Sequence, residues 1–264
     1  MTTVVSHDVL ELHGVGKSFG PVVALSSVDF SAAAGEVTAL VGDNGAGKST
    51  LVKSIGGIHR IDAGEIRIDG TAQHLHEPRD AAQLGIEIVH QDLALCDNLD
   101  VVGNMFLGRE RLGRFHTLDE NTMEHLAGET LASLSVRTVR SVRQKVASLS
   151  GGQRQTVAIA KSVLWSSKIV ILDEPTAALG VAQTEQVLEL VRRLADHGVA
   201  VVLVSHNMND VMQVADSIAV LFLGRMATQV RRTSVTQTQV VELITSGRSG
   251  DLGLPGAESI GAPA

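Results

Sequence analysis

The sequence predicts an α/β fold built on a mainly parallel β-sheet, and two features of the chain support this fold class. Short apolar runs with the length of buried strands, such as residues 199–204 and 218–223, alternate with stretches of helical periodicity. Buried strands that alternate with helices form parallel sheets with helices on both faces. A glycine-rich segment, residues 42–49, also lies between an apolar run and a helical pattern. With 264 residues, 44% of them hydrophobic, the chain can bury the core of one or two domains.

Strand patterns dominate the first third of the chain. Residues 9–30 alternate between apolar and polar side chains, with breaks at Gly14 and at Gly20-Pro21, which indicates strands and a turn. The pattern further predicts strands at residues 36–41, 65–69 and 86–90, a helix at 48–55 and a turn at 62–64.

The middle of the chain is different in character. Residues 92–148 have few strand-like runs and are predicted to form a mostly helical insertion, with helical spacing over 99–107 and 118–134. Helix and strand then alternate again, with helices expected at 151–164 and 181–197 and strands at 168–172 and 199–205. Residues 246–264 are rich in Gly, Ser, Ala and Pro without periodicity, which predicts a disordered tail.

Composition and charge argue against several classes of function. A net charge of −7 does not suit a nucleic-acid-binding protein, so no nucleic-acid partner is expected. The nearest basic stretch is interpreted as a solvated face and consists of Arg137, Arg140, Arg143 and Lys145. Cys96 is the only cysteine, which excludes an intrachain disulfide and a cysteine metal cage. No apolar run reaches the roughly 18 residues that span a bilayer, and residues 1–10 lack a secretory pattern.

Residues 42–49 match the phosphate-binding pattern G-x-x-x-x-G-K-[ST] in full. Glycines let the backbone turn its N–H groups toward phosphate oxygens, and the N-terminus of the following helix adds a favourable dipole. Lys48 would bring a positive charge to the β- and γ-phosphates, and Ser49 would offer a hydroxyl to Mg²⁺. The segment predicts a nucleotide site.

Two carboxylates follow an apolar strand pattern at residues 169–172. Asp173, at the strand end, is placed to hold Mg²⁺, and Glu174 is the candidate that polarises the attacking water. In-line phosphoryl transfer asks the protein mainly for positioning and charge neutralisation, so one carboxylate beside the water suffices.

A second anion site is predicted at residues 149–153, which read Leu-Ser-Gly-Gly-Gln ahead of a helical pattern. Backbone N–H groups at a helix N-terminus attract phosphate. One chain needs only one phosphate cradle for each nucleotide, so the second cradle makes sense if it faces a nucleotide bound elsewhere.

These three elements, in this order, resemble the ATP-binding cassette (ABC) ATPases over residues 9–245. The resemblance implies a P-loop NTPase (RecA-like) core with an antiparallel β subdomain and an inserted α-helical subdomain. It implies a single ABC ATPase domain at residues 8–245, with the helical subdomain at about 92–148. In this family the LSGGQ segment closes head-to-tail on the ATP of a partner subunit, so the resemblance implies an ATPase that works as a dimer. ATP and Mg²⁺ are therefore the expected cofactors.

The resemblance also assigns roles to single residues. Phe19 matches the aromatic residue that stacks on adenine, although a Phe at a strand end is often only part of the core. Gln91 matches the glutamine that reaches Mg²⁺ and water, and His206 the histidine that contacts the γ-phosphate. Catalysis is thus expected from Glu174, His206 and Gln91, and Mg²⁺ ligation from Ser49, Gln91 and Asp173. The expected ATP contacts are Phe19, Gly42, Asp43, Asn44, Gly45, Ala46, Gly47, Lys48, Ser49, Thr50, Ser150, Gly151, Gly152 and Gln153.

Residues 90–95 and 104–110 resemble the ATPase subunits of bacterial importers of simple sugars of the ribose, xylose and fructose type. That branch implies a peripheral subunit on the cytoplasmic face of the membrane, which docks on an integral permease through residues 92–107. The expected partners are a second copy of the chain, the permease and, indirectly, a sugar-binding protein. The chain departs from the family at Gly180, where an aspartate is usual, so communication between the two sites is expected to differ.

Two other classes of function remain open at this stage. A non-transport ABC ATPase would act with soluble partners in DNA repair or translation. The repair type interrupts the two motifs with a long coiled coil and the translation type fuses two cassettes, and the sequence shows neither. A regulatory module with weak catalysis would lack Glu174 or His206, and both are present. The sequence does not identify the sugar, because specificity would reside in the permease and the binding protein.

Overall fold

The computed structural model of the chain describes residues 8–136 and 138–248. A six-stranded sheet forms its centre, with the strand order β10-β9-β3-β8-β7-β6. The strands are β3 (Val37–Val41), β6 (Ile86–Val89), β7 (Ile169–Asp173), β8 (Ala200–Val204), β9 (Ser217–Phe222) and β10 (Arg225–Arg231). Only β10 runs antiparallel to its neighbour, so the predicted mainly parallel sheet is confirmed.

A second sheet is antiparallel and has the order β2-β1-β4-β5. Its strands are β1 (Asp8–Phe19), β2 (Val22–Ala33), β4 (Ala63–Ile68) and β5 (Thr71–Gln73). The turn predicted at Gly20-Pro21 joins β1 to β2. Gly14 does not end a strand, because its positive φ of 59° is accommodated inside β1 where the register shifts between Leu12 and Val15.

Alternating side chains of the central sheet separate two faces of the core, as expected for strands. Leu40, Ile171 and Val202 point to one face, where they pack with α1 (Lys48–Ile55) and with the antiparallel sheet. Val170 and Leu203 point to the other face, among the helices α5 (Gly151–Val163) and α6 (Val181–Asp196). The strands β3 and β9 pack there against α7 (Met208–Val214) and α8 (Gln237–Ser246). Helices therefore lie on both faces of the central sheet, and on one face the antiparallel sheet packs beside the helix.

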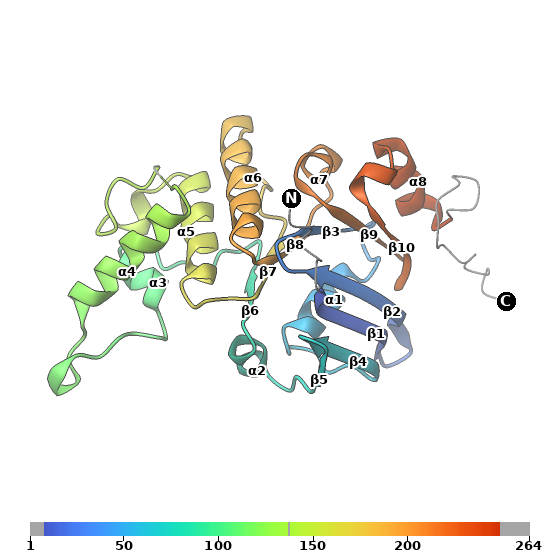
Figure 1. Cartoon of the computed structure of the whole chain (residues 1–264), viewed down its shortest axis with the longest axis horizontal. Helices are drawn as coiled ribbons and strands as arrows, with labels where there is room; N and C mark the ends of the chain where they lie inside the picture. The colour runs from blue at the N-terminus through green and yellow to red at the C-terminus, as the bar shows by residue number, and fades with distance from the viewer. Residues whose placement is uncertain (1–7, 137, 249–264) are drawn as a thin grey trace, which may run out of the picture.

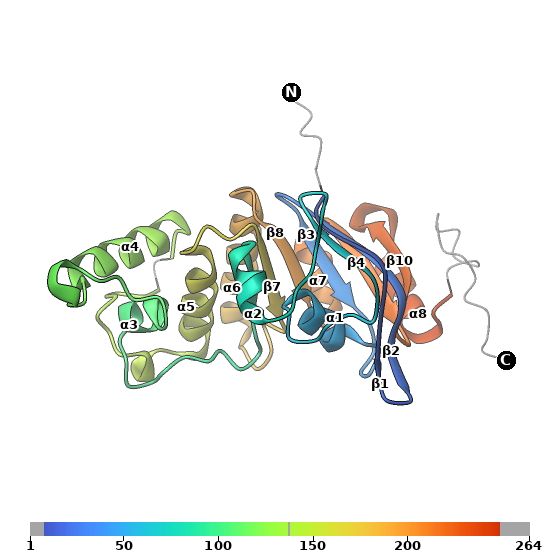
Figure 2. The same ribbon diagram turned by 90° about the horizontal axis from the view of Figure 1, so that it is seen from below.

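The predicted helical insertion is confirmed as an arm at one end of the long axis of the molecule, while α8 lies near the other end (Figures 1 and 2). The arm contains α3 (Val101–Phe106), α4 (Glu120–Ser133) and the 3₁₀ turns Arg114–His116 and Val146–Ser148. A third 3₁₀ turn, Arg232–Ser234, precedes α8. Five helices and strands were not predicted: β5, β10, α7, α8 and α2 (Pro78–Gln83), which Glu77 and Asp80 begin with a capping box.

The end of the chain differs in part from the expectation. Ser246 belongs to α8 rather than to a disordered tail, and Gly247 ends that helix with a φ of 63°. The remainder of the predicted tail, residues 249–264, lies outside the described residues, as do residues 1–7 and 137. Within residues 8–136 and 138–248, no helix combines the length and the apolar character needed to cross a membrane.

Candidate nucleotide site

The glycine-rich segment forms a tight loop between the end of β3 and the start of α1. Gly47 has a φ of 107°, and a Cβ atom there would lie 2.7 Å from the backbone oxygen of Ala24. At Gly42 a Cβ atom would collide with the backbone oxygen of Leu221. The two glycines are therefore required by close backbone approach, and the loop can direct its N–H groups toward a bound anion.

The loop borders a pocket of about 440 Å³ that is open to solvent. Its lining combines the loop and α1 with the tip of the β1–β2 hairpin and the β9–β10 turn, and consists of Val22, Val23, Ala24, Asn44, Gly45, Gly47, Lys48, Ser49, Thr50, Leu223 and Gly224. One side of the pocket offers polar groups for phosphates, and the hairpin offers apolar side chains for a base. This volume lies within the range of small-molecule sites.

Lys48 lies over the loop rather than in open solvent. Its Nζ atom donates to the carbonyl oxygens of Gly42 and Asp43, at 2.7 and 3.0 Å. Burial lowers the pKa of the Lys48 ammonium, while the carboxylates of Glu174, Asp43 and Asp173 act in the opposite direction. The positive charge is thus held at the phosphate end of the pocket by the chain's own backbone.

Asp173 and Glu174 extend from the carboxyl end of β7 toward the same region. Glu174 has a φ of 51°, and its backbone N–H donates to the carbonyl of Val204 at 2.9 Å. Burial, and then the neighbouring charge of Glu174, raise the pKa of the Asp173 carboxyl. His90, Lys48 and Lys53 oppose this shift by weaker attraction. The carboxylates of Asp173 and Glu174 and the ammonium of Lys48 therefore lie within electrostatic reach of one another at the edge of the sheet.

Replacing Asp173 with Asn is expected to raise the melting temperature of the nucleotide-free protein near pH 7. Because the folded-state pKa of Asp173 is raised, protonation stabilises the fold fully below the unfolded pKa, and this contribution is lost as the pH rises through the folded pKa. The ionised carboxylate therefore costs stability near neutral pH, and Asn removes that cost. Calorimetry of both proteins from about pH 4 to about pH 7 measures the difference. A variant that melts no higher than the wild type near pH 7 would contradict this assignment.

His206 follows β8 and contacts Glu174 directly. Its Nδ1 atom lies 2.8 Å from Glu174 Oε2, and the side chain is 73% exposed whereas that of Glu174 is 17% exposed. The carboxyl ends of β7 and β8 are neighbours in the sheet, with Asp173 paired to Val204, which explains why residues far apart in sequence meet here. The histidine can orient the carboxylate and still present its outer edge to a ligand.

Asp210 and Asn207 also organise this edge, and neither was predicted as a site residue. Asp210 is buried, accepts from Thr176 Oγ1 at 2.6 Å, and accepts from Asn207 Nδ2 at 2.9 Å. These bonds tie the segment after Glu174 to the segment after His206. The available signal was weak, because a single Asp in the first turn of a helix is usually only a favourable dipole contact.

Gln91 and Phe19 flank the site. Gln91 is exposed just after β6, whose Val89 pairs with Leu172 of β7, so it lies at the same edge of the sheet as the two carboxylates. Phe19 is 43% exposed at the end of β1, and its ring meets the His59 ring edge-on at a centroid distance of 5.1 Å. Phe19 does not line the pocket, although Val22 and Val23 across the turn do.

The predicted second anion site is formed by the start of α5. Ser150 caps the helix in a capping box with Gln153, whose side chain accepts from the Ser150 N–H at 2.8 Å and donates to the carbonyl of Thr138 at 2.6 Å. Gly152 is buried, and a Cβ atom there would approach Gln183 to 3.0 Å. Gly180, the departure from the family pattern, begins α6 without a side-chain cap.

The structure groups these residues into two sets. The loop, both carboxylates, Gln91 and His206 follow the carboxyl ends of strands in the central sheet. The helices α5 and α1 lie apart along the long axis of the molecule (Figures 1 and 2). Among the described residues, no hydrogen bond or ion pair joins residues 150–153 to residues 42–50. The two predicted anion sites of one chain are therefore separate from each other.

A family model matches the part of the chain that contains the loop, the capped start of α5 and the two carboxylates. Residues 25–177 match the model described as ABC transporter. The chain belongs to the ABC transporter family. It is an ATP-binding cassette, and the cassettes of this family are ATPases. The predicted P-loop NTPase fold with its helical and antiparallel parts is confirmed by this family and by the architecture.

Two relatives resemble this ABC cassette over nearly its whole length. The fructose import ATP-binding protein FrcA of Rhizobium meliloti is 43% identical over 246 residues, which are 91% of this chain and 95% of FrcA. The xylose/arabinose import ATP-binding protein XylG of Sulfolobus acidocaldarius is 42% identical over 247 residues, 94% of this chain and 98% of XylG. Among solved structures, a dimeric ATP-binding cassette in a post-hydrolysis state with ADP and phosphate is 27% identical, with a TM-score of 0.69, and covers 84% of this chain and 98% of its own.

Proposed function

We propose that this ABC ATPase energises the uptake of a simple sugar through a partner membrane permease. The observation that carries the proposal is an identity above 40% over more than nine-tenths of the chain to two sugar-import ATP-binding proteins. The site supports it, because a phosphate loop, Lys48, Glu174 and His206 converge at one edge of the sheet. A catalytically weak regulatory module would not need this set.

In this proposal, Glu174 is the general base. The oxygen of a water attacks the γ-phosphorus of ATP, its proton passes to the Glu174 carboxylate, and the bond to the β–γ bridging oxygen breaks as ADP leaves. His206 holds the carboxylate at 2.8 Å and contacts the γ-phosphate with its exposed edge. Lys48 leaves the carbonyls of Gly42 and Asp43 to meet the β- and γ-phosphates.

The residues around the loop also fit a magnesium ion. The side chains of Ser49, Gln91 and Asp173 offer hydroxyl, amide and carboxylate oxygens, which are the donors that Mg²⁺ prefers. Burial and a neighbouring carboxylate raise the pKa of Asp173, so a cation beside it would relieve an existing electrostatic cost. When bound, Mg²⁺ neutralises charge on the β- and γ-phosphates. The chain's own contribution would be to offer these oxygens beside the loop.

We propose further that two copies of the chain share their sites. Residues 150–153 of one copy would close on the nucleotide held by residues 42–50 of the other, with Phe19 beside the adenine. Two observations support this arrangement: the capped start of α5 lies away from its own loop, and a solved cassette of similar fold is dimeric with ADP and phosphate. The cassette domain would span residues 8–245, with its helical subdomain at about 92–148.

The helical arm is the proposed contact with the permease. It carries exposed apolar side chains at Leu107, Leu112 and Leu118, with exposed fractions of 40%, 60% and 52%. Exposed apolar side chains that gather into one patch rimmed by polar residues are typical of interaction surfaces. The docking segment would be residues 92–107, directly after Gln91, which would link the permease to the hydrolysis site. The cassette would then sit at the cytoplasmic face of the membrane, and a sugar-binding protein would complete the system.

The transport role is tested by purifying the membrane complex of the protein from its native host and identifying by mass spectrometry what co-purifies. Recovery of a multi-span permease and a sugar-binding protein is expected, and the bound sugar of the latter names the substrate class. Recovery of soluble partners alone, such as ribosomes or repair factors, would overturn the importer proposal. It would leave the ATPase unaffected, because that rests on the loop and its carboxylates.

A further inference from the structure

The signature segment, residues 149–153, follows a stretch of turns, residues 142–148, that is joined to the start of the arm by backbone hydrogen bonds. The N–H groups of Val101 and Val102 donate to the carbonyls of Gln144 and Val142, both at 3.1 Å. Val146 donates to the carbonyl of Leu99 at 3.0 Å. Residues 97–102 and 142–147 therefore run side by side, which connects the segment after Gln91 to the segment before Ser150.

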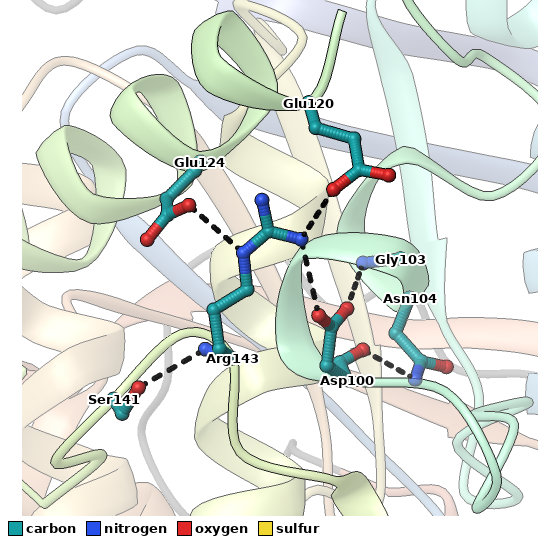
Figure 3. Close-up of polar contacts among 7 residues, drawn as sticks. All are labelled: Asp100, Gly103, Asn104, Glu120, Glu124, Ser141 and Arg143. Atoms are coloured by element: carbon teal, nitrogen blue, oxygen red, sulfur yellow. Dashed lines mark hydrogen bonds and ion pairs between the residues drawn. The ribbon is translucent and has the colours of Figure 1, made fainter. Parts of the chain in front are cut away.

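Arg143 lies at the centre of this pairing and contacts three carboxylates from other parts of the arm (Figure 3). Its Nε atom lies 2.8 Å from Glu124, and its Nη1 atom lies 3.1 Å from Glu120 and 3.5 Å from Asp100. Glu120 and Glu124 belong to α4, and Asp100 caps α3 through its bond from the Gly103 N–H at 2.7 Å. One guanidinium thus joins two helices to the segment that leads into residues 149–153.

The surroundings of Arg143 make it different from an isolated surface ion pair. Asn104 is fully buried and fixes the same region, because its side chain accepts from the Cys96 N–H at 2.7 Å and donates to the Asp100 carbonyl at 2.9 Å. Without Arg143, the carboxylates of Asp100, Glu120 and Glu124 would face one another uncompensated, so the cluster would turn from attractive to repulsive. The change would act on both helices at once.

The helix α5, which begins in the signature segment, makes further contacts with residues 97–102 and with the stretch that leads to residues 142–147. Arg154 of α5 lies 3.0 Å from Asp97, and the carbonyl of Asp97 accepts from Ala147 at 3.1 Å. Gln153 donates to Thr138, which lies on the same stretch of chain as Arg143. A shift of residues 142–147 would therefore move the N-terminus of α5, where the anion-binding N–H groups lie.

We propose that Arg143 is a positioning residue for ATP hydrolysis at the partner's nucleotide, because it holds residues 142–147, which lead into the signature segment, against α3 and α4. The inference rests on the proposed sharing of sites between two copies. Arg143 touches no nucleotide and acts through residues 150–153. Its effect is therefore on turnover in the other subunit, and binding of ATP to its own loop is unaffected.

The first test is Arg143→Gln in the full-length chain. The kcat is expected to fall about tenfold, the size of coupling that such networks carry, with an unchanged Kd for a fluorescent ATP analogue. The matched control is Arg67→Gln, since Arg67 is also exposed and paired, at 2.6 Å to Glu65 on the antiparallel sheet, and its kcat should stay at the wild-type value. If Arg143→Gln does not fold, Arg143→Lys replaces it, because one ammonium keeps the charge but cannot bridge three carboxylates. A wild-type kcat would overturn the proposal.

Mixing variants separates action on the partner from action on the same chain. In a mixed dimer, the loop of the Arg143→Gln chain meets the signature segment of the Lys48→Ala chain, so one site has both halves intact. The mixture should therefore hydrolyse ATP faster than the summed rates of the two variants measured alone. Ser150→Arg mixed with Lys48→Ala is the positive control, because Ser150 belongs to the signature segment itself. Rescue in the control alone would overturn the role of Arg143. Rescue in neither mixture would contradict the shared site and, with it, the basis of this inference.

Discussion

Replacing Glu174 with Gln is expected to reduce ATP turnover about a thousandfold, the contribution of a positioned general base. The amide keeps the shape of the side chain and can still accept a hydrogen bond from His206, but it does not take a proton from water. The N–H of residue 174 still donates to Val204, so the local backbone is retained. The loop and Lys48 are untouched, and ATP binding should remain at the wild-type level.

Steady-state hydrolysis and equilibrium binding of labelled ATP measure the two effects separately. His206→Ala is the companion variant, since it removes the group 2.8 Å from the carboxylate but leaves the base itself. Its loss of turnover should be smaller than that of Glu174→Gln. Turnover near the wild-type rate in Glu174→Gln would show that another group activates the water.

Replacing Lys48 with Ala is expected to weaken ATP binding by about a hundredfold, because a charge-assisted contact to phosphate is lost. The side chain occupies the phosphate end of the pocket, where it donates to Gly42 and Asp43. Burial lowers the pKa of Lys48, so its ammonium is incompletely solvated in the free protein and gains from an anionic ligand. Isothermal titration with ATP measures the effect.

Lys53→Ala is the matched control for this variant. Lys53 is an exposed lysine on the same helix, and no atom of it lines the pocket. Its removal takes away one positive charge without touching the loop, so its ATP affinity should stay within about twofold of the wild type. Equal losses in the two variants would mean that Lys48 acts only through overall charge.

Strands and helices that bury apolar side chains could be predicted from the sequence, because period and length identify them. The strand at Val37–Val41 and the helix at Lys48–Ile55 illustrate this, with the glycine-rich loop fixed between them. The short elements β5 and α2 could not, since neither has enough residues for a period to appear. The break predicted at Gly14 was wrong, because a glycine inside a bulged strand cannot be distinguished in the sequence from a glycine in a turn.

Long-range polar contacts were the part of the site that the sequence could not show. His206 and Glu174 were each expected near the γ-phosphate, but their contact depends on the neighbouring positions of β7 and β8. Arg143 was interpreted as part of a solvated basic face, and it is indeed partly exposed. Its three acidic neighbours lie between 19 and 43 residues away along the chain, so only the fold reveals the cluster.

The central claim is that two copies of this cassette enclose ATP between the loop of one and the signature segment of the other. Light scattering of the Glu174→Gln protein, with and without ATP and Mg²⁺, tests it most directly, because this variant binds nucleotide without consuming it. The mass is predicted to be that of one chain, 27.8 kDa, without nucleotide and about twice that value with it. A mass that stays at 27.8 kDa at saturating ATP would contradict the shared site.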